Sequence, residues 1–113
     1  MKNIISLFLI ASLSLANHFN LNIEETGSST LFIFEDTISS LSPGDEIGIF
    51  DLDGIIDDDG SFGSLLVGSG VWDGQQLSIA AISSIDLSQF GGPVLPGAVS
   101  GHDMFLKVWD SSV

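Results

Sequence analysis

The 113-residue sequence contains no cysteine and only two basic residues, Lys2 and Lys107. Without cysteine the chain cannot form a disulfide, a thiol nucleophile or a thiolate metal site. Fifteen acidic residues stand against the two bases and give a net charge of −13. Because a surface this negative repels phosphate groups, we expect neither nucleic acid nor an anionic membrane surface as a partner.

Amphipathic helices are also missing, because no segment after Ala16 carries apolar residues at the spacing of a helix. Short β-rich segments recur instead about every 8–12 residues, separated by Gly, Pro and Asp, which is typical of an antiparallel β-sandwich. The predicted fold is therefore all-β, of jelly-roll or immunoglobulin-like type. The predicted strands cover residues 19–24, 30–34 (an interior strand), 46–50, 65–72, 77–82 and 104–109.

Turn residues divide these strands. Pro43 and Gly44 predict a tight turn before residue 46, and Asp73-Gly74 predicts a hairpin that pairs residues 65–72 with 77–82. The glycine-rich acidic stretch 51–63 and the stretch 86–102, which holds two prolines and four glycines, are predicted to be loops.

The N-terminus carries a long apolar run. Residues 4–16 have no charge and follow Lys2, and the small residues Ser14 and Ala16 occupy the two positions that a signal peptidase reads. This is the layout of a helical secretory signal peptide, and the run is too short to cross a bilayer comfortably. We predict cleavage after Ala16, a secreted or cell-surface location, and a mature chain of residues 17–113 that forms one small domain without membrane insertion.

Five aspartates fall close together around two glycines. Hard cations such as Ca²⁺ bind several carboxylate and carbonyl oxygens on a flexible loop, so this cluster is a candidate calcium site, although its spacing does not fit an EF-hand. The alternative is a solvated acidic loop that discourages pairing at a sheet edge. The candidate metal ligands are Asp51, Asp53, Asp57, Asp58 and Asp59.

Three strands end in an aromatic residue followed by aspartate, and the rings are Phe50, Trp72 and Trp109. In one interpretation each ring closes the edge of the core while the aspartate starts a turn. In the other, strand alternation places the rings on a wetter face, Trp72 together with Gly68 and Gly70, where they stack on a sugar or peptide ligand.

The second interpretation assigns the opposite, aliphatic faces of the same strands to the core. Those faces carry Ile47, Ile49, Val67, Val71, Met104, Leu106 and Val108. A single β-bulge would reverse this assignment in the strand that contains it.

Groupings typical of catalysis are scarce. No serine stands in a Gly-x-Ser-x-Gly sequence, and no glycine-rich stretch is followed by lysine as a phosphate loop requires. His102 and Asp103 could form the His-Asp half of a catalytic relay. The alternative, which is more common, is a surface histidine that precedes a strand and has no catalytic role. We therefore do not expect an enzyme.

Four segments resemble a β-sandwich module that is found in secreted and surface proteins of Gram-negative bacteria, often cargo of type IX secretion. They are residues 26–29, 41–51, 67–72 and 105–110, and the most specific motif is Gly-Asp-Glu-Ile-Gly-Ile-Phe-Asp-Leu-Asp at 44–53. The resemblance implies an adhesion-like or accessory module. The acidic loop is longer than in the pattern, and residues 84–102 lack its Trp-Gly-Asp-Asp run. Such modules continue beyond the final Trp-Asp, which implies a truncated C-terminus and neighbouring domains.

Together these features predict a secreted, non-catalytic binding or adhesion module, with a glycan or a cell-surface protein as partner and Ca²⁺ as its cofactor if the acidic loop binds metal. A structural spacer within a larger surface protein is the first alternative. A small glycan-acting hydrolase is the second, although a domain of this size leaves little room for a cleft with two buried carboxylates.

Overall fold

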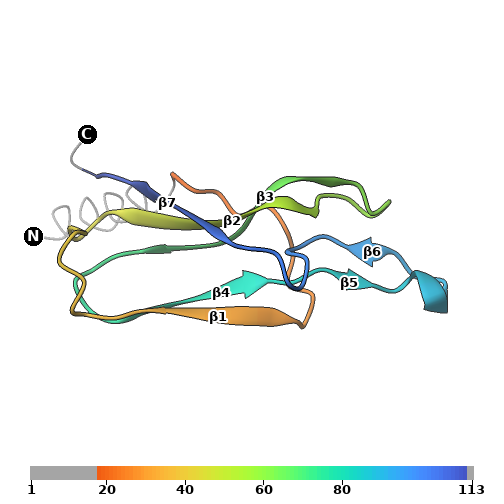
Figure 1. Cartoon of the computed structure of the whole chain (residues 1–113), viewed down its shortest axis with the longest axis horizontal. Coiled ribbons are helices and arrows are strands. Elements are labelled where there is room, and N and C mark those ends of the chain that lie inside the picture. The colour runs from red at the N-terminus through yellow and green to blue at the C-terminus, as the bar shows by residue number, and fades with distance from the viewer. Residues whose placement is uncertain (1–17, 112–113) are drawn as a thin grey trace, which may run out of the picture.

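The computed structural model describes residues 18–111, and the predicted signal peptide, residues 1–16, lies outside this range (Figure 1). Within the described residues the structure is almost entirely β and its sheets are antiparallel, which confirms the predicted fold class. No helix in this part of the chain is long and apolar enough to cross a membrane.

Two main sheets and one short sheet make up the fold. The larger sheet has the strand order β3-β2-β7, the second pairs β1 with β4, and the short one pairs β5 with β6. Figure 1 shows β1 beside β4, β2 beside β7, and the β5–β6 pair extending toward one end. In chain order the elements are β1 (Ser29–Phe34), β2 (Glu46–Ile55), β3 (Phe62–Val71), β4 (Leu77–Ile82), β5 (Ile85–Asp86), the 3₁₀ turn η1 (Ser88–Phe90), β6 (Val94–Leu95) and β7 (Phe105–Trp109).

The hydrophobic core lies between the two main sheets. Ile47 and Ile49 of β2 and Val67 of β3 pack with Ile79 and Ala81 of β4, and all five side chains are buried. The two isoleucines of β2 are two residues apart and therefore lie on one face of the strand. Their assignment to the core from the sequence is confirmed.

Two glycines of β3 allow the sheets to approach each other closely. A Cβ atom on Gly68 would lie 2.9 Å from Cγ2 of Ile79 and 3.0 Å from the backbone oxygen of Ala80. A Cβ atom on Gly70 would lie 3.1 Å from two side-chain carbons of the same isoleucine. The face of β3 that carries these glycines is thus the core face, and side chains there would push β4 away.

This result corrects the predicted faces of β3. Ile49 pairs with Gly68 and Phe50 pairs with Leu66, so Val67 is an extra residue in a β-bulge. The bulge reverses the alternation beyond it, and Gly68 therefore faces the core although the sequence placed it on the wetter side. Trp72, which continues that face, is buried with 1% of its surface exposed.

The predicted hairpin around Asp73-Gly74 is wrong, because β3 pairs with β2 and β4 pairs with β1. Trp72 extends the β2–β3 pairing: its backbone nitrogen donates to the oxygen of Asp45 at 2.8 Å, and its oxygen accepts from the nitrogen of Gly44 at 2.7 Å. The chain then leaves for the other sheet. The turn at Pro43-Gly44 is confirmed, since Asp45 N donates to Ser42 O at 3.0 Å and Gly44 has φ +97°.

Four other segments differ from their predictions. Residues 19–24 form no strand, and residues 30–34 lie in β1, a strand that pairs only with β4 and leaves Leu31 59% exposed, so it is not interior. The first five residues of the predicted loop 51–63 belong to β2, and its last two belong to β3. The predicted loop 86–102 includes η1 and β6.

The predicted core face of β7 does face the core, but its side chains are only partly buried. Leu106 pairs with Ile49 and Val108 with Ile47, so these side chains lie on the same face as the core. They are nevertheless 52% and 51% exposed. The second sheet has only two strands, and β3 packs against β4, so the described chain leaves β7 partly uncovered.

Candidate functional site

Asp51 and His102 form a side-chain pair that joins β2 to the segment before β7. Asp51 lies within β2, is 1% exposed, and has a carboxylate oxygen 3.0 Å from Nδ1 of His102. The same carboxylate accepts the backbone nitrogens of Asp53 and Val99, each at 2.9 Å. An ionised carboxylate in this position selects the His102 tautomer that carries its proton on Nδ1.

Burial alone would raise the pKa of Asp51, but the N–H groups of Val99 and Asp53 and the nearby His102 outweigh it and lower the pKa below its usual value. The carboxylate is therefore charged at neutral pH. It fixes the segment that precedes β7 onto β2. Asp51 and His102 are 51 residues apart in the sequence.

That segment also joins the ends of the two sheets. Gly97 exchanges two backbone hydrogen bonds with Ile55 at the end of β2, at 2.9 and 3.0 Å. Ala98 donates to the oxygen of Ile82 at 2.8 Å and accepts from the nitrogen of Ser84 at 2.9 Å. A Cβ atom on Gly97 would lie 2.5 Å from backbone atoms of Ser83 and Ser84, so glycine is needed at this crossing.

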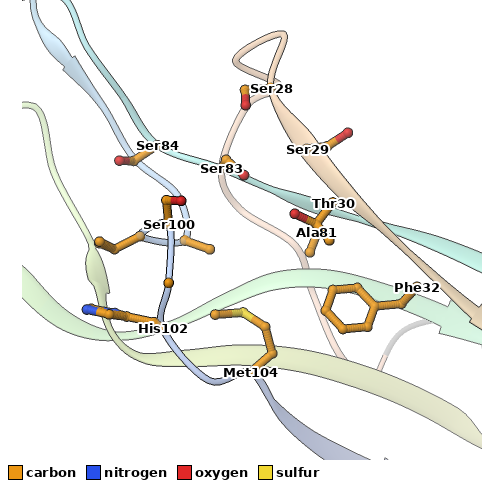
Figure 2. Close-up of a pocket in the computed structure, with 13 residues that line it drawn as sticks. Ser28, Ser29, Thr30, Phe32, Ala81, Ser83, Ser84, Ser100, His102 and Met104 are labelled. Carbon is orange, nitrogen blue, oxygen red and sulfur yellow. The ribbon is translucent and has the colours of Figure 1, made fainter.

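A pocket of about 360 Å³ lies beside this segment, and we call it the serine pocket. The start of β1, the end of β4 with the two residues after it, and residues 98–102 with Met104 form its walls. In Figure 2 the Phe32 ring and the Met104 side chain lie close together on one side, with Ser83 and Ser100 across from them. The Ser and Thr residues of the lining are Ser28, Ser29, Thr30, Ser83, Ser84 and Ser100. Ser29 and Thr30 are neighbours in β1 and lie on opposite faces, and Thr30 shares its face with Phe32.

The pair of Asp51 and His102 is missed by sequence reasoning, which considered Asp103 as the partner of His102. No local signal identifies a contact between positions so far apart in the chain. Within residues 18–111 the His102 ring hydrogen-bonds only to Asp51, and no serine is bonded to its other nitrogen. The described residues therefore hold an oriented imidazole without an activated nucleophile.

The five predicted metal ligands are spread over β2 and the loop that follows it. Asp51 is committed to His102, and Asp57 accepts the backbone nitrogens of Asp59 and Ser61 at 3.1 and 3.0 Å within its own loop. Asp53, Asp58 and Asp59 are exposed, and residues 18–111 contain no group of three or more acidic or histidine side chains placed to hold a metal ion. The N–H group of Ser61 lowers the pKa of Asp57.

The three predicted ligand-binding rings do not share a surface. Trp72 is buried, whereas Phe50 and Trp109 lie on the outer face of the larger sheet. There the N-terminal residues cover them: the His18 ring stacks on Trp109 at a centroid distance of 4.9 Å, and Phe19 meets Phe50 edge to face at 5.8 Å.

Glu46 and Lys107 complete this outer face. Glu46 is only 2% exposed, and its carboxylate accepts the backbone nitrogens of His18 and Phe19 at 3.0 and 3.2 Å. The Nζ atom of Lys107 lies 4.6 Å from the centroid of the Phe50 ring, a cation–π contact. The outer face therefore binds His18 and Phe19, the first two described residues of its own chain.

Comparison of the chain with protein-family models, curated proteins and solved structures gives no significant match. The resemblance of its sequence motifs to a bacterial surface module stays a prediction.

Proposed function

We propose that this chain is an exported, non-catalytic binding module that holds its ligand in the serine pocket. The observation that carries the proposal is a hollow without any acidic lining residue in a chain of net charge −13. The segments that form its walls are held by backbone hydrogen bonds and by Asp51, so the site is preformed. A glycan or a cell-surface protein is the proposed partner.

The arrangement of His102 supports binding over catalysis. A hydrolase of the serine type needs a hydroxyl group bonded to the second imidazole nitrogen, and a glycosidase needs two facing carboxylates. The serine pocket has several hydroxyl groups but no carboxylate in its lining. The proposed role of the Asp51–His102 pair is to hold the wall of the pocket in place.

The outer face of the larger sheet is a weaker candidate for the ligand site. Its Phe50 and Trp109 rings are already in contact with Phe19 and His18. A ligand that used these rings would first have to displace the N-terminal residues from Glu46. The serine pocket requires no such displacement.

The test is a binding screen of the full chain, expressed for export, against arrayed glycans, peptides and surface proteins. We compare the wild type with Ser100→Trp, which fills the pocket from its exposed rim, and with Ser64→Trp, which places the same ring on an exposed position of β3. We expect the wild type and Ser64→Trp to bind the same ligand and Ser100→Trp to lose it. A wild type that binds nothing favours the spacer role, and turnover of chromogenic glycosides overturns the non-catalytic assignment.

A further inference from the structure

We infer that the serine pocket accepts one terminal sugar ring of an uncharged glycan. This inference rests on the proposed function and names its ligand class. It is argued from the size, the charge and the chemistry of the pocket lining.

The size of the pocket favours a small ligand group. Its volume of about 360 Å³ is at the lower end of the range of about 300–1,000 Å³ typical of ligand sites. The pocket is lined by β1, the end of β4, and residues 98–102 with Met104. A single ring fits such a space, whereas an extended peptide requires a longer groove.

The charge of the pocket favours a neutral ligand. Four other hollows of the described residues each include at least one acidic side chain, whereas the lining of the serine pocket has none. Its one titratable lining residue is His102, whose Nδ1 faces Asp51. A cation finds no carboxylate inside the pocket, and an anion is repelled by the acidic chain as a whole.

The chemistry of the lining matches a molecule with one apolar face and a rim of hydroxyl groups. Phe32 and Met104 supply apolar surface, and Thr30, Ser83 and Ser100 supply hydroxyl groups that both donate and accept hydrogen bonds. Figure 2 shows the Phe32 ring and Met104 on one side and the hydroxyl groups of Ser83 and Ser100 on the other. A pyranose ring has this same division between a C–H face and its hydroxyl groups, and an aromatic ring packs well on the C–H face.

Met104 gives a probe inside the pocket. The chain has two methionines, and the other is Met1 in the predicted signal peptide. We label the methionine methyl groups of the exported protein with ¹³C, assign Met104 with a Met104→Leu sample, and titrate with glucose, galactose, mannose and N-acetylglucosamine. Glucuronate serves as the charged comparison and a dipeptide amide as the peptide comparison.

We expect one neutral sugar to shift the Met104 signal in a saturable way, with half-saturation at about 1 mM as befits a ligand of this size. Thr30→Val and Ser100→Ala each remove one lining hydroxyl group and should weaken that binding by about fivefold to tenfold. Ser64→Ala, outside the pocket, should leave it unchanged, and equal melting temperatures show that the variants are folded.

Three results overturn the inference. A Met104 signal that no neutral sugar shifts up to about 50 mM removes the sugar assignment, and a peptide or surface protein bound in the earlier screen still leaves the binding function standing. A stronger response to glucuronate or to the dipeptide amide assigns the pocket to another ligand class. Sugar binding that weakens equally in Ser64→Ala and Ser100→Ala places the ligand elsewhere on the domain.

Discussion

Both carboxylate oxygens of Glu46 accept the backbone nitrogen of His18, each at 3.0 Å, across 28 residues of sequence. One buried side chain thus fixes the first described residue of the chain onto β2. Phe19 follows over Gly48, where an added Cβ atom would lie 3.0 Å from its ring. Residues 18 and 19 are thus held on β2 by the Glu46 carboxylate and by the packing of Phe19 over Gly48.

Glu46→Ala should therefore lower the free energy of unfolding by about 1–2 kcal/mol, because two backbone N–H groups in a partly buried position lose a charged acceptor. Urea unfolding measures the loss. Trp109 should also become more exposed to solvent as His18 leaves its ring, which shifts tryptophan emission to longer wavelength. Glu35→Ala, at an exposed position, is the matched control and should change little. Equal effects of the two substitutions would contradict the anchoring role of Glu46.

Gly68→Val should destabilise the domain by about 1–3 kcal/mol, since its side chain would meet Ile79 and the backbone of β4. The control is Ser64→Val in the same strand, at an exposed position where a β-branched residue suits a strand. Thermal melting followed by circular dichroism compares the two. If Gly68→Val melts with Ser64→Val, the close approach of the sheets is not required for stability.

Asp51 should make the free energy of unfolding depend on pH in the acidic range. Its pKa in the folded state is lowered by hydrogen bonds, so the stabilisation is present above the unfolded pKa of about 3.9 and is lost as the pH falls through the lower folded value. The wild type should exceed Asp51→Asn in stability at pH 7, and the difference should shrink below about pH 4. Asp53→Asn, at an exposed position, should show no such difference, and a gap that stays constant from pH 7 to pH 3 would exclude a charged Asp51 as its source.

Calcium should leave the melting temperature unchanged up to about 5 mM. The predicted ligands do not converge in the described residues, and Asp51 and Asp57 already accept backbone N–H groups. A ligand that binds only the folded state raises its stability in proportion to occupancy, so a calcium-dependent rise is the sensitive readout. A rise that chelation reverses and magnesium does not reproduce would support the calcium site predicted from the sequence.

The general β architecture follows from local features of the sequence, whereas the pairing of its strands does not. Alternation in residues 46–50 and the Pro43-Gly44 turn are local, and both hold in the structure. Asp73-Gly74 suits a hairpin equally well locally, but the pairing of Trp72 with residues 44 and 45 directs the chain to the other sheet. Strand partners are chosen by long-range packing, which a turn dipeptide does not encode.

The site shows the same limit. Acidic residues around 51–59 are visible as a cluster, but the burial of Asp51 depends on Val99 and His102, which come from the far end of the chain. The face of Trp72 depends on one extra residue, Val67, which no pattern in the sequence marks as a bulge. The serine pocket joins three segments and has no sequence motif at all.

The open outer edge of β1 has a practical consequence for anyone who concentrates this protein. Leu31 and Ile33 are more than half exposed, and within the described residues β1 has a neighbour on one side only. Mutual repulsion between copies of net charge −13 opposes edge-to-edge association, and dissolved ions weaken that repulsion. Dilute buffer, rather than added sodium chloride, should keep the protein monodisperse.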